Sequence, residues 1–245
     1  MHGQSFGHDD ELVGFDSGWH EHAHHQLLYA LEGTLRMHVG DRQWLLPPQR
    51  GAWITGGVSH RVTTEGASLR TVYFSEDPVA DLGDVRVFAM PPLAREMVRY
   101  SIRWGRDRAD DSLPADFFSL LLDLVESDWS ERTYEFSLPE GQTRETRRAI
   151  DFAMEHLDEA DLQSAAEAAF VSPRTLSRRF ADELGTTWRD FLRQARMIRA
   201  MELLAAGATV TETSLAVGYD SLSAFSHAFK SMTGESPRSY CSVGH

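Results

Sequence analysis

The residues best suited to chemistry are histidines gathered near the N-terminus. His20, His22, His24 and His25 lie in the segment WHEHAHHQ, and His60 follows in TGGVSHRV. Neutral imidazole is the commonest protein ligand for divalent transition metals. If the first segment is a strand, alternate histidines point to one face of it. A metal site in this part of the chain is therefore one hypothesis for its chemistry.

A second group with functional potential lies in the C-terminal half. Arg174, Ser177 and Arg178 are spaced i, i+3 and i+4, so on a helix they share one face. Arginine can bond guanine edges in the major groove of DNA and can also reach phosphates. An isolated arginine is more often a solvated surface charge. The interpretation as a DNA-reading face therefore depends on the surrounding pattern.

That pattern is an internal repeat with a period of 49 residues. The matching pairs are Ser172 and Ser221, Leu176 and Phe225, Ser177 and Ser226, Phe180 and Phe229, Gly185 and Gly234, and, upstream, Phe170 and Tyr219. Each copy has a serine at a helix N-cap position, two apolar residues four apart, and a glycine where a left-handed C-terminal residue is needed. A helix of small residues precedes each copy. The arrangement predicts two helix-turn-helix units, which is typical of a DNA-binding domain.

The second unit has a different exposed face. Leu222, Ser223, Ser226 and His227 occupy the positions that match the arginine-bearing face of the first unit. This face is nearly neutral, so we expect it to read methyl groups or DNA shape, or to contact bases weakly.

An amphipathic helix, TTWRDFLRQARMIRAMELLAAG, is predicted between the two units. A helix of roughly 18 residues is about 27 Å long, so it could hold two recognition helices about one DNA turn (~34 Å) apart. Of its arginines, Arg196 is the one that we expect to be held inward by a carboxylate.

These features together resemble one family of bacterial regulators. Residues from about 160 to 240 are similar to the DNA-binding domain of the AraC/XylS family, through SPRTLSRRF, ARMIRAMELLAAG and VGYDSLSAFSHAFKSMTGESPRSY. The resemblance implies that the base-contacting residues are Arg174, Ser177, Arg178, Leu222, Ser223, Ser226 and His227. One departure is Thr213-Ser214, where the family usually has Ile-Ala. It would place two hydroxyls in a packed site.

The N-terminal half is predicted to be β-structure followed by helices. Turn signals interrupt residues 26–74 at Glu32-Gly33, Gly40-Asp41, Pro47-Pro48, Gly56-Gly57 and Glu65-Gly66. Short strands at this spacing indicate a sandwich or a small barrel. Residues 91–130 change to a helical period. Their predicted apolar face consists of Leu93, Met97, Tyr100 and Trp104. These helices could belong to the domain core or form a homodimer contact.

The histidine segments resemble the two metal motifs of cupin barrels, which many AraC/XylS regulators place before the DNA-binding half. His20, His22 and Gln26 match the first motif and LLPPQRGAWITGGVSHRV, with His60, matches the second. The resemblance implies that these four side chains hold Zn²⁺, Ni²⁺ or Fe²⁺, with water completing the shell. Cupin enzymes usually have Glu where Gln26 stands. The alternative is a set of histidines that binds no metal, or that lines a pocket for an organic ligand.

The predicted architecture is α+β, with a cupin-like β-barrel before an all-α domain that has two helix-turn-helix units. The expected divisions are an effector- or metal-sensing barrel over 1–90, a helical segment over 91–135, a linker over 136–143 and the DNA-binding domain over 144–245. The net charge of −13 is uneven: residues 1–143 hold 12 of the 24 Lys and Arg but 23 of the 37 Asp and Glu. The DNA-binding half is thus nearly neutral, which suits a reader with a local basic face.

The leading hypothesis is a cytoplasmic transcriptional regulator that binds double-stranded promoter DNA and responds to a small molecule or a metal ion. It is expected not to be an enzyme. The alternative is a metal-dependent cupin enzyme with an accessory helical domain, and a third hypothesis makes the C-terminal half a protein-interaction bundle. No apolar run is long enough for a membrane span, and the single cysteine, Cys241, rules out an intrachain disulfide.

Overall fold

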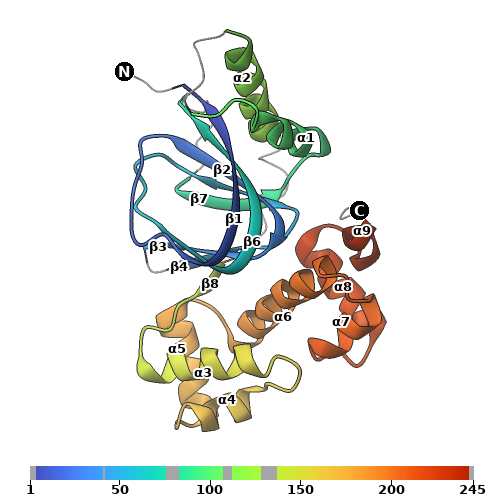
Figure 1. Ribbon diagram of the computed structural model, residues 1–245. Helices are drawn as coiled ribbons and strands as arrows, with labels where there is room; N and C mark the ends of the chain where they lie inside the picture. Colours follow the sequence, from blue (N-terminus) through green and yellow to red (C-terminus); the bar gives the residue numbers. More distant parts are fainter. Residues whose placement is uncertain (1–3, 41, 76–82, 107–111, 128–136, 243–245) are drawn as a thin grey trace. The chain divides into compact units, whose positions relative to one another are not determined.

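The structure is a computed structural model that describes residues 4–40, 42–75, 83–106, 112–127 and 137–242 (Figure 1). The chain forms two compact units: Met1–Gly40 with Trp44–Glu135, and Asp41–Gln43 with Phe136–His245. The first is built mainly on β-strands and the second mainly on α-helices. The predicted α+β class, with a sheet domain before a helical one, is confirmed. Within the described ranges, no helix is long and apolar enough to cross a membrane.

A curled sheet forms the first unit. Its strands are β1 (Phe6–Asp16), β2 (His25–Gly33), β3 (Leu35–Val39), β4 (Arg42–Leu46), β5 (Arg50–Ile54), β6 (Arg61–Phe74) and β7 (Val85–Ala89). They follow the order β7-β5-β2-β6-β3-β4, and β1 also pairs with β6. The long strand β6 is thus hydrogen-bonded to β1, β2 and β3, in each case antiparallel.

The pairing of β2 with β6 ends at a glycine that no other residue could replace. Gly33 has a φ of +71°, and a Cβ atom there would lie 2.0 Å from the carbonyl oxygen of Gly66. A register shift between Ala30 and Glu32 precedes it. Bulges of this kind bend and twist a strand pair, and this one lets β6 leave β2 and continue beside β3.

One face of the sheet is covered by two helices, α1 (Pro92–Ser101) and α2 (Ser112–Ser127). The shared core consists of Leu27, Tyr29, Trp53, Val72, Phe74, Phe88, Met90, Ala94, Met97, Val98, Phe118, Leu121, Leu122 and Val125. Full burial of each large apolar side chain contributes about 1.5–3 kcal/mol to folding. Because side chains alternate along a strand, Leu28, Thr71 and Tyr73 point to the opposite face of the sheet, which is where the cavity described below lies.

The prediction of helices after the sheet is confirmed, and Met97 is buried as predicted, but Leu93 and Tyr100 of the predicted apolar face are not. Leu93 and Tyr100 are 58% and 52% exposed, and Trp104 lies beyond the end of α1. The buried face consists of Ala94, Met97, Val98 and Ser101. Met97 and Val98 from this face belong to the core that α1 shares with the sheet.

The segment expected to be a linker contains a strand. β8 (Ser137–Pro139) has two buried residues, and the side chain of Gln194 donates a hydrogen bond to the carbonyl of Ser137 (2.9 Å). Thr143 then caps the next helix through reciprocal hydrogen bonds with Thr146. Residues 137–143 are therefore an ordered part of the second unit.

The second unit contains seven described helices. They are α3 (Arg144–Glu155), α4 (Leu162–Ala168), α5 (Pro173–Leu184), α6 (Trp188–Ala205), α7 (Val210–Ala216), α8 (Leu222–Thr233) and α9 (Pro237–Ser242). The predicted helix-turn-helix pairs are α4 with α5 and α7 with α8, and α6 joins them, as Figure 1 shows.

The predicted boundaries of both recognition helices are confirmed. Ser172 accepts a hydrogen bond from the backbone amide of Thr175, and Ser221 accepts one from that of Ala224. The helices end at Gly185 and Gly234, which have φ values of +64° and +80°. The two apolar pairs, Leu176 with Phe180 and Phe225 with Phe229, are fully buried.

The repeat is shifted by one residue in the turn between the helices. The sequence pairs Phe170 with Tyr219, but Phe170 is the left-handed residue (φ +59°) and is 80% exposed. In the second helix-turn-helix, the left-handed residue of the turn is Gly218 (φ +75°). Tyr219 instead packs against Phe225, with ring centroids 5.7 Å apart. The period of 49 therefore holds for the recognition helices only.

Replacing Gly218 by alanine is expected to destabilise the second unit strongly. An added Cβ would lie 2.3 Å from the carbonyl oxygen of Asp158 and 2.9 Å from Nη2 of Arg196, in addition to the cost of a positive φ. Gly207→Ala is a matched control, because Gly207 also has a positive φ (+90°) but has open space around its Cα. The control should cost about 1–2 kcal/mol, and Gly218→Ala clearly more. Urea denaturation of both variants measures this difference, and equal midpoints would contradict it.

Candidate DNA-reading faces and histidine centre

Recognition helix α5 presents its predicted DNA-binding residues to solvent. Arg174, Ser177 and Arg178 are all exposed, on the side opposite the buried stripe of the helix. Neither arginine forms a hydrogen bond or an ion pair with any residue that the structure describes. Two unpaired guanidinium groups on one helical face can reach base edges and phosphates.

Recognition helix α8 presents a neutral face. Leu222 (44% exposed), Ser223 and His227 are exposed, and Ser226 is half-buried. The structure thus brings all seven predicted residues to two helical faces. The first face carries two cationic side chains, whereas the second offers hydroxyls, an imidazole and an apolar side chain.

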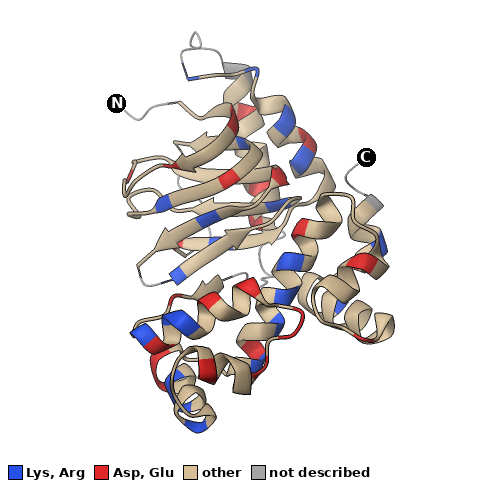
Figure 2. Cartoon of the chain, turned by 60° about the horizontal axis from the view of Figure 1, so that its bottom comes forward, with Lys and Arg blue, Asp and Glu red and all other residues tan. Residues whose placement is uncertain are grey.

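The charges of the helical unit are mixed. Figure 2 shows basic and acidic residues interspersed along its helices. Several arginines are neutralised locally: Arg179 lies 3.3 Å from Glu145 and 3.1 Å from Glu183, which ties α5 to α3. A nonspecific basic coat is therefore absent from the helices described, and the unpaired charge of Arg174 and Arg178 is local.

The second helix-turn-helix unit contains the two hydroxyls that its sequence predicts in a packed site. Thr213 and Ser214 are 0% and 3% exposed. Ser214 donates to the carbonyl of Tyr219 (3.3 Å), but Oγ1 of Thr213 has no hydrogen-bond partner among the described residues. A buried polar atom without a partner costs about 1–3 kcal/mol, so α7 is held less firmly than its counterpart α4, which buries Ala165 and Ala166 there.

In the first unit, three of the predicted metal-ligating histidines converge. One ring nitrogen from each of His20, His22 and His60 lies within 4.8 Å of those of the other two. The ring centroids of His20 and His60 are 4.3 Å apart, and those of His22 and His60 are 5.0 Å apart. His20 and His60 also form an isolated β-bridge through their backbones. The two histidine motifs, 40 residues apart in the chain, therefore meet.

The outer nitrogen of each ring is already bonded to the backbone. The Nδ1 atoms of His20, His22 and His60 lie 3.1, 2.7 and 2.8 Å from carbonyl oxygens of residues 18, 24 and 58. A carbonyl only accepts, so each Nδ1 carries the hydrogen and each Nε2 of a neutral ring keeps its lone pair. Metal-binding histidines are commonly oriented in this way.

Burial favours the neutral form of the deepest ring. His60 is 1% exposed, and its Nε2 has no hydrogen-bond partner in the part of the chain described. Burial lowers the pKa of His60 and outweighs the opposing effect of its hydrogen bond to Val58, and the nearby imidazoles of His20 and His22 lower it slightly further. The ring is therefore neutral near pH 7, which is the form that binds metals.

Gln26 lies beside the three histidines. Its Oε1 is 3.2 Å from Nε2 of His22, and its Nε2 donates to Oη of Tyr73 (3.2 Å). Two lone pairs, one on Oε1 and one on the ring nitrogen, thus face each other, and a shared cation or proton would stabilise this arrangement. The residues present fit a metal ion.

The centre lies at the edge of a cavity of about 210 Å³. Its polar lining comes from His8, Asp10, Ser17, His20, Gln26, His60, Thr71 and Tyr73, and its apolar lining from Leu12, Phe15, Leu28, Leu35, Val62 and Leu69. Sequence reasoning did not find Tyr73 or the apolar lining. The positions of Leu69, Thr71 and Tyr73, two residues apart, indicate that these side chains share one face of a strand. Their spacing does not predict the bend of the sheet that brings residues of β1 and β3 to the same cavity.

The expectation that His20, His22 and His24 share one face of a strand is wrong. Only the backbone bridge of His20 is β-structure there, and His22 and His24 lie in the connection that leads to β2. The His24 ring packs against Phe6, with centroids 5.7 Å apart, and does not join the cluster. The convergence arises from folding of a loop and not from strand alternation.

Comparison with known families decides the class of protein. A family model described as an AraC-like ligand binding domain matches residues 2–141, and one described as a helix-turn-helix domain matches residues 165–242. The chain belongs to the AraC family of transcriptional regulators. It is a DNA-binding regulator with a cupin-like ligand-binding domain in front of the helix-turn-helix domain, as predicted.

Relatives of the chain are named as HTH-type transcriptional regulators. The HTH-type transcriptional regulator NimR of Escherichia coli is 27% identical to this AraC-family regulator over 233 residues, 94% of this chain and 83% of its own. The uncharacterized HTH-type transcriptional regulator Rv1395 of Mycobacterium tuberculosis is 47% identical over 75 residues, 30% of this chain and 22% of its own.

Solved structures similar to the C-terminal part of the chain include domains of two regulators. The C-terminal domain of AraT from Geobacillus stearothermophilus is 36% identical, with a TM-score of 0.39, and covers 41% of this chain and 86% of its own. The DNA-binding domain of AdpA, solved with a target DNA, is 28% identical, with a TM-score of 0.39, and covers 41% and 93%.

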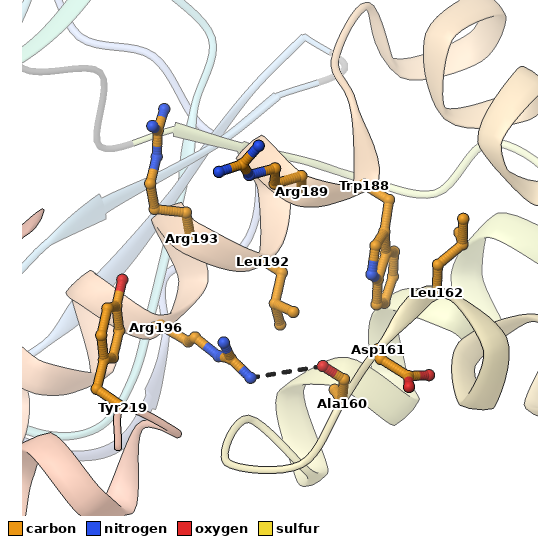
Figure 3. A pocket seen from close by; sticks show the side chains of 9 residues that line it. All are labelled: Ala160, Asp161, Leu162, Trp188, Arg189, Leu192, Arg193, Arg196 and Tyr219. Carbon is orange, nitrogen blue, oxygen red and sulfur yellow. Dashed lines mark hydrogen bonds between the residues drawn. The ribbon is translucent and has the colours of Figure 1, made fainter. Parts of the chain in front are cut away.

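In this AraC-family regulator a cleft of about 380 Å³ lies beside α6, between the two helix-turn-helix units (Figure 3). Arg196 points across it and donates from Nε to the carbonyl of Leu157 (2.7 Å) and from Nη2 to those of Asp158 and Ala160 (both 3.4 Å). The inward orientation of Arg196 is confirmed, but its partners are backbone carbonyls and not a carboxylate. They belong to the loop between α3 and α4, so this side chain joins α6 to the first helix-turn-helix.

Arg196→Met is expected to destabilise the regulator by about 2–3 kcal/mol, because hydrogen bonds from a charged donor are lost and partly buried carbonyls are left without a partner. Arg193→Met is the matched control on the same helix. Arg193 is 64% exposed and pairs only with Asp190 among the interactions described, so its removal should cost under about 1 kcal/mol. Urea denaturation compares the two variants. A control as unstable as Arg196→Met would show that α6 simply tolerates no methionine on this side.

Proposed function

We propose that this regulator reads promoter DNA with α5 and α8 and that a divalent metal ion at the histidine centre is part of the signal it senses. The proposal is carried by the convergence of His20, His22 and His60, whose Nδ1 atoms are fixed by backbone carbonyls and whose Nε2 atoms are left to face an ion. Binding of the signal then alters DNA affinity. The regulator acts by binding and not by catalysis, in the cytoplasm, where promoter DNA lies.

The roles of the DNA-reading residues follow from their chemistry. Arg174 and Arg178 bond guanine edges or phosphates, and Ser177 between them contacts a base or the backbone. In the second helix-turn-helix, Ser223, Ser226 and His227 contribute weaker polar contacts, and Leu222 contacts a thymine methyl group. Helix α6 has 18 residues and so is about 27 Å long, which suits two helices in successive major grooves.

The roles at the histidine centre follow from its geometry. His20, His22 and His60 would hold Zn²⁺, Ni²⁺ or Fe²⁺ through Nε2, and Gln26 would lie next to the ion or bind it through Oε1. A bound ion supplies a positive charge and open coordination positions at the edge of the cavity. The competing hypothesis of a metal-dependent enzyme is disfavoured, because the chain belongs to a regulator family.

We also propose that the regulator forms a homodimer through its first unit. Three large apolar side chains on α1 and α2 are more than half exposed: Leu93, Tyr100 and Leu120. Exposed apolar groups gathered on a helix pair are typical of an association surface.

The double variant Arg174→Ala/Arg178→Ala is expected to lose specific DNA binding. Each arginine that bonds a guanine edge contributes about 1–3 kcal/mol, and each lost phosphate contact lowers the salt slope by about one. Fluorescence anisotropy on the mapped promoter site, at several salt concentrations, measures both quantities. The control Arg36→Ala/Arg70→Ala removes the same charge from the sheet unit, away from α1 and α2, and should change the affinity by less than about threefold. Equal loss in both variants would mean that net charge, and not the α5 face, determines binding.

One Zn²⁺ or Ni²⁺ ion is expected to bind per chain, and His60→Ala should weaken it by more than about 100-fold, since even outer-shell partners contribute 10- to 100-fold. Isothermal titration of protein purified without a histidine tag measures this. His8→Ala is the control: His8 lines the same cavity but is bonded to Asp10 (3.0 Å).

DNA titrations of the same samples test whether the metal is part of the signal. The metal should change DNA affinity, and DNA should change metal affinity, by one common factor, typically 5- to 150-fold. Identical DNA affinities for metal-free and metal-loaded protein would leave the ion with a structural role only and would sink the sensing proposal.

A further inference from the structure

We infer that the histidine centre is a receptor for a small organic anion, a carboxylate with an apolar body, and that Gln26 keeps the centre cationic so that this anion can bind. The inference rests on the metal site proposed above. It names the class of effector and the residue that selects it.

The charge of the ligand set is the first step. The group that the structure brings together consists of His20, His22 and His60, and no carboxylate of the described residues belongs to it. Neutral imidazoles do not compensate the charge of a divalent ion. The bound ion would therefore keep a charge of about +2 at the edge of a partly enclosed cavity, where the attraction for an anion is stronger than in water.

The second observation is the position of the uncharged Gln26 amide beside the histidines. Its Oε1 lies 3.2 Å from Nε2 of His22, and two ligands at about 2.1 Å from one ion, at right angles, lie about 3 Å apart. The Gln26 amide is 7% exposed and is held in place by Tyr73. A carboxylate in this position would bind the ion and cancel half of its charge. The amide binds weakly and carries no charge, so it leaves a position that an external oxygen anion can take.

The third observation is the apolar lining of the cavity, which indicates that the body of the ligand is apolar. Beside Gln26 its wall is formed by Leu28, Leu35 and Leu69, all buried, with Val62 and Leu12. A ligand whose carboxylate reached the ion would lay its remaining atoms against these side chains. The volume of about 210 Å³ admits a small molecule and no polymer.

Asp10 is the one carboxylate in the described lining of the cavity. It is bonded to His8 (3.0 Å) and is not a member of the converging group. It faces the anion at longer range and should oppose its binding. This makes Asp10 a useful control, because removing its charge should act in the direction opposite to adding one at Gln26.

The test uses the full chain loaded with Co²⁺, whose visible absorption reports its coordination. Benzoate should shift the Co²⁺ bands in a saturable manner. Its neutral counterpart benzamide should not, and acetate, which lacks the apolar body, should bind at least tenfold more weakly than benzoate. Gln26→Glu should bind Co²⁺ at least tenfold more tightly and benzoate at least tenfold more weakly than the native protein. Asp10→Asn should bind benzoate at least as tightly as the native protein does.

The outcomes separate the two levels of the proposal. Failure of the native chain to bind Co²⁺ would overturn the metal site and the receptor together. Binding of Co²⁺ with no response to benzoate, or with an equal response to benzamide, would overturn the anion receptor alone. Native benzoate affinity in Gln26→Glu would overturn the role of Gln26.

Discussion

The alternation of side chains along β2 and β6 is the constraint on which the first unit depends. Leu27, Val72 and Phe74 point to the helices α1 and α2, and their neighbours Leu28 and Tyr73 point into the cavity. Each strand therefore builds the core with one set of residues and the binding wall with the other. A shift of register by one residue would exchange the two sets, so the stability of the core also fixes the shape of the cavity.

In the helical unit, capping and burial determine which side chains are free. Serine N-caps and left-handed glycines define both recognition helices, and the buried pairs on them decide which face remains outside. The first helix-turn-helix is further tied to α6 by Arg196, a single side chain that donates to backbone carbonyls of the α3–α4 loop. The exposed residues Arg174 and Arg178 are thus placed by interactions in which they take no part.

Local features with strong chemical preferences were predictable from sequence. The repeat, both serine caps and the terminal glycines followed from residue type, and the two helical faces on which the seven candidate residues lie followed from their spacing. What depended on long-range packing was not predictable. The sequence indicated which histidines belong together, but the loop that gathers His22, the buried face of α1 and the backbone partners of Arg196 arise from contacts between distant segments. The one-residue shift of the turn at Phe170 was not predicted, because a left-handed conformation is unusual for a bulky residue.

The unpaired hydroxyl of Thr213 has a consequence for how the two halves of the reader move. Because this hydroxyl is buried without a partner, we expect α7 to open locally more often than α4, which buries alanines at the equivalent place. If α5 and α8 read DNA as proposed, a more rigid half and a more adaptable half meet the operator together. Such a protein can hold one half-site strictly and accept variation in the other, so a single regulator can serve promoters whose second half-sites have diverged.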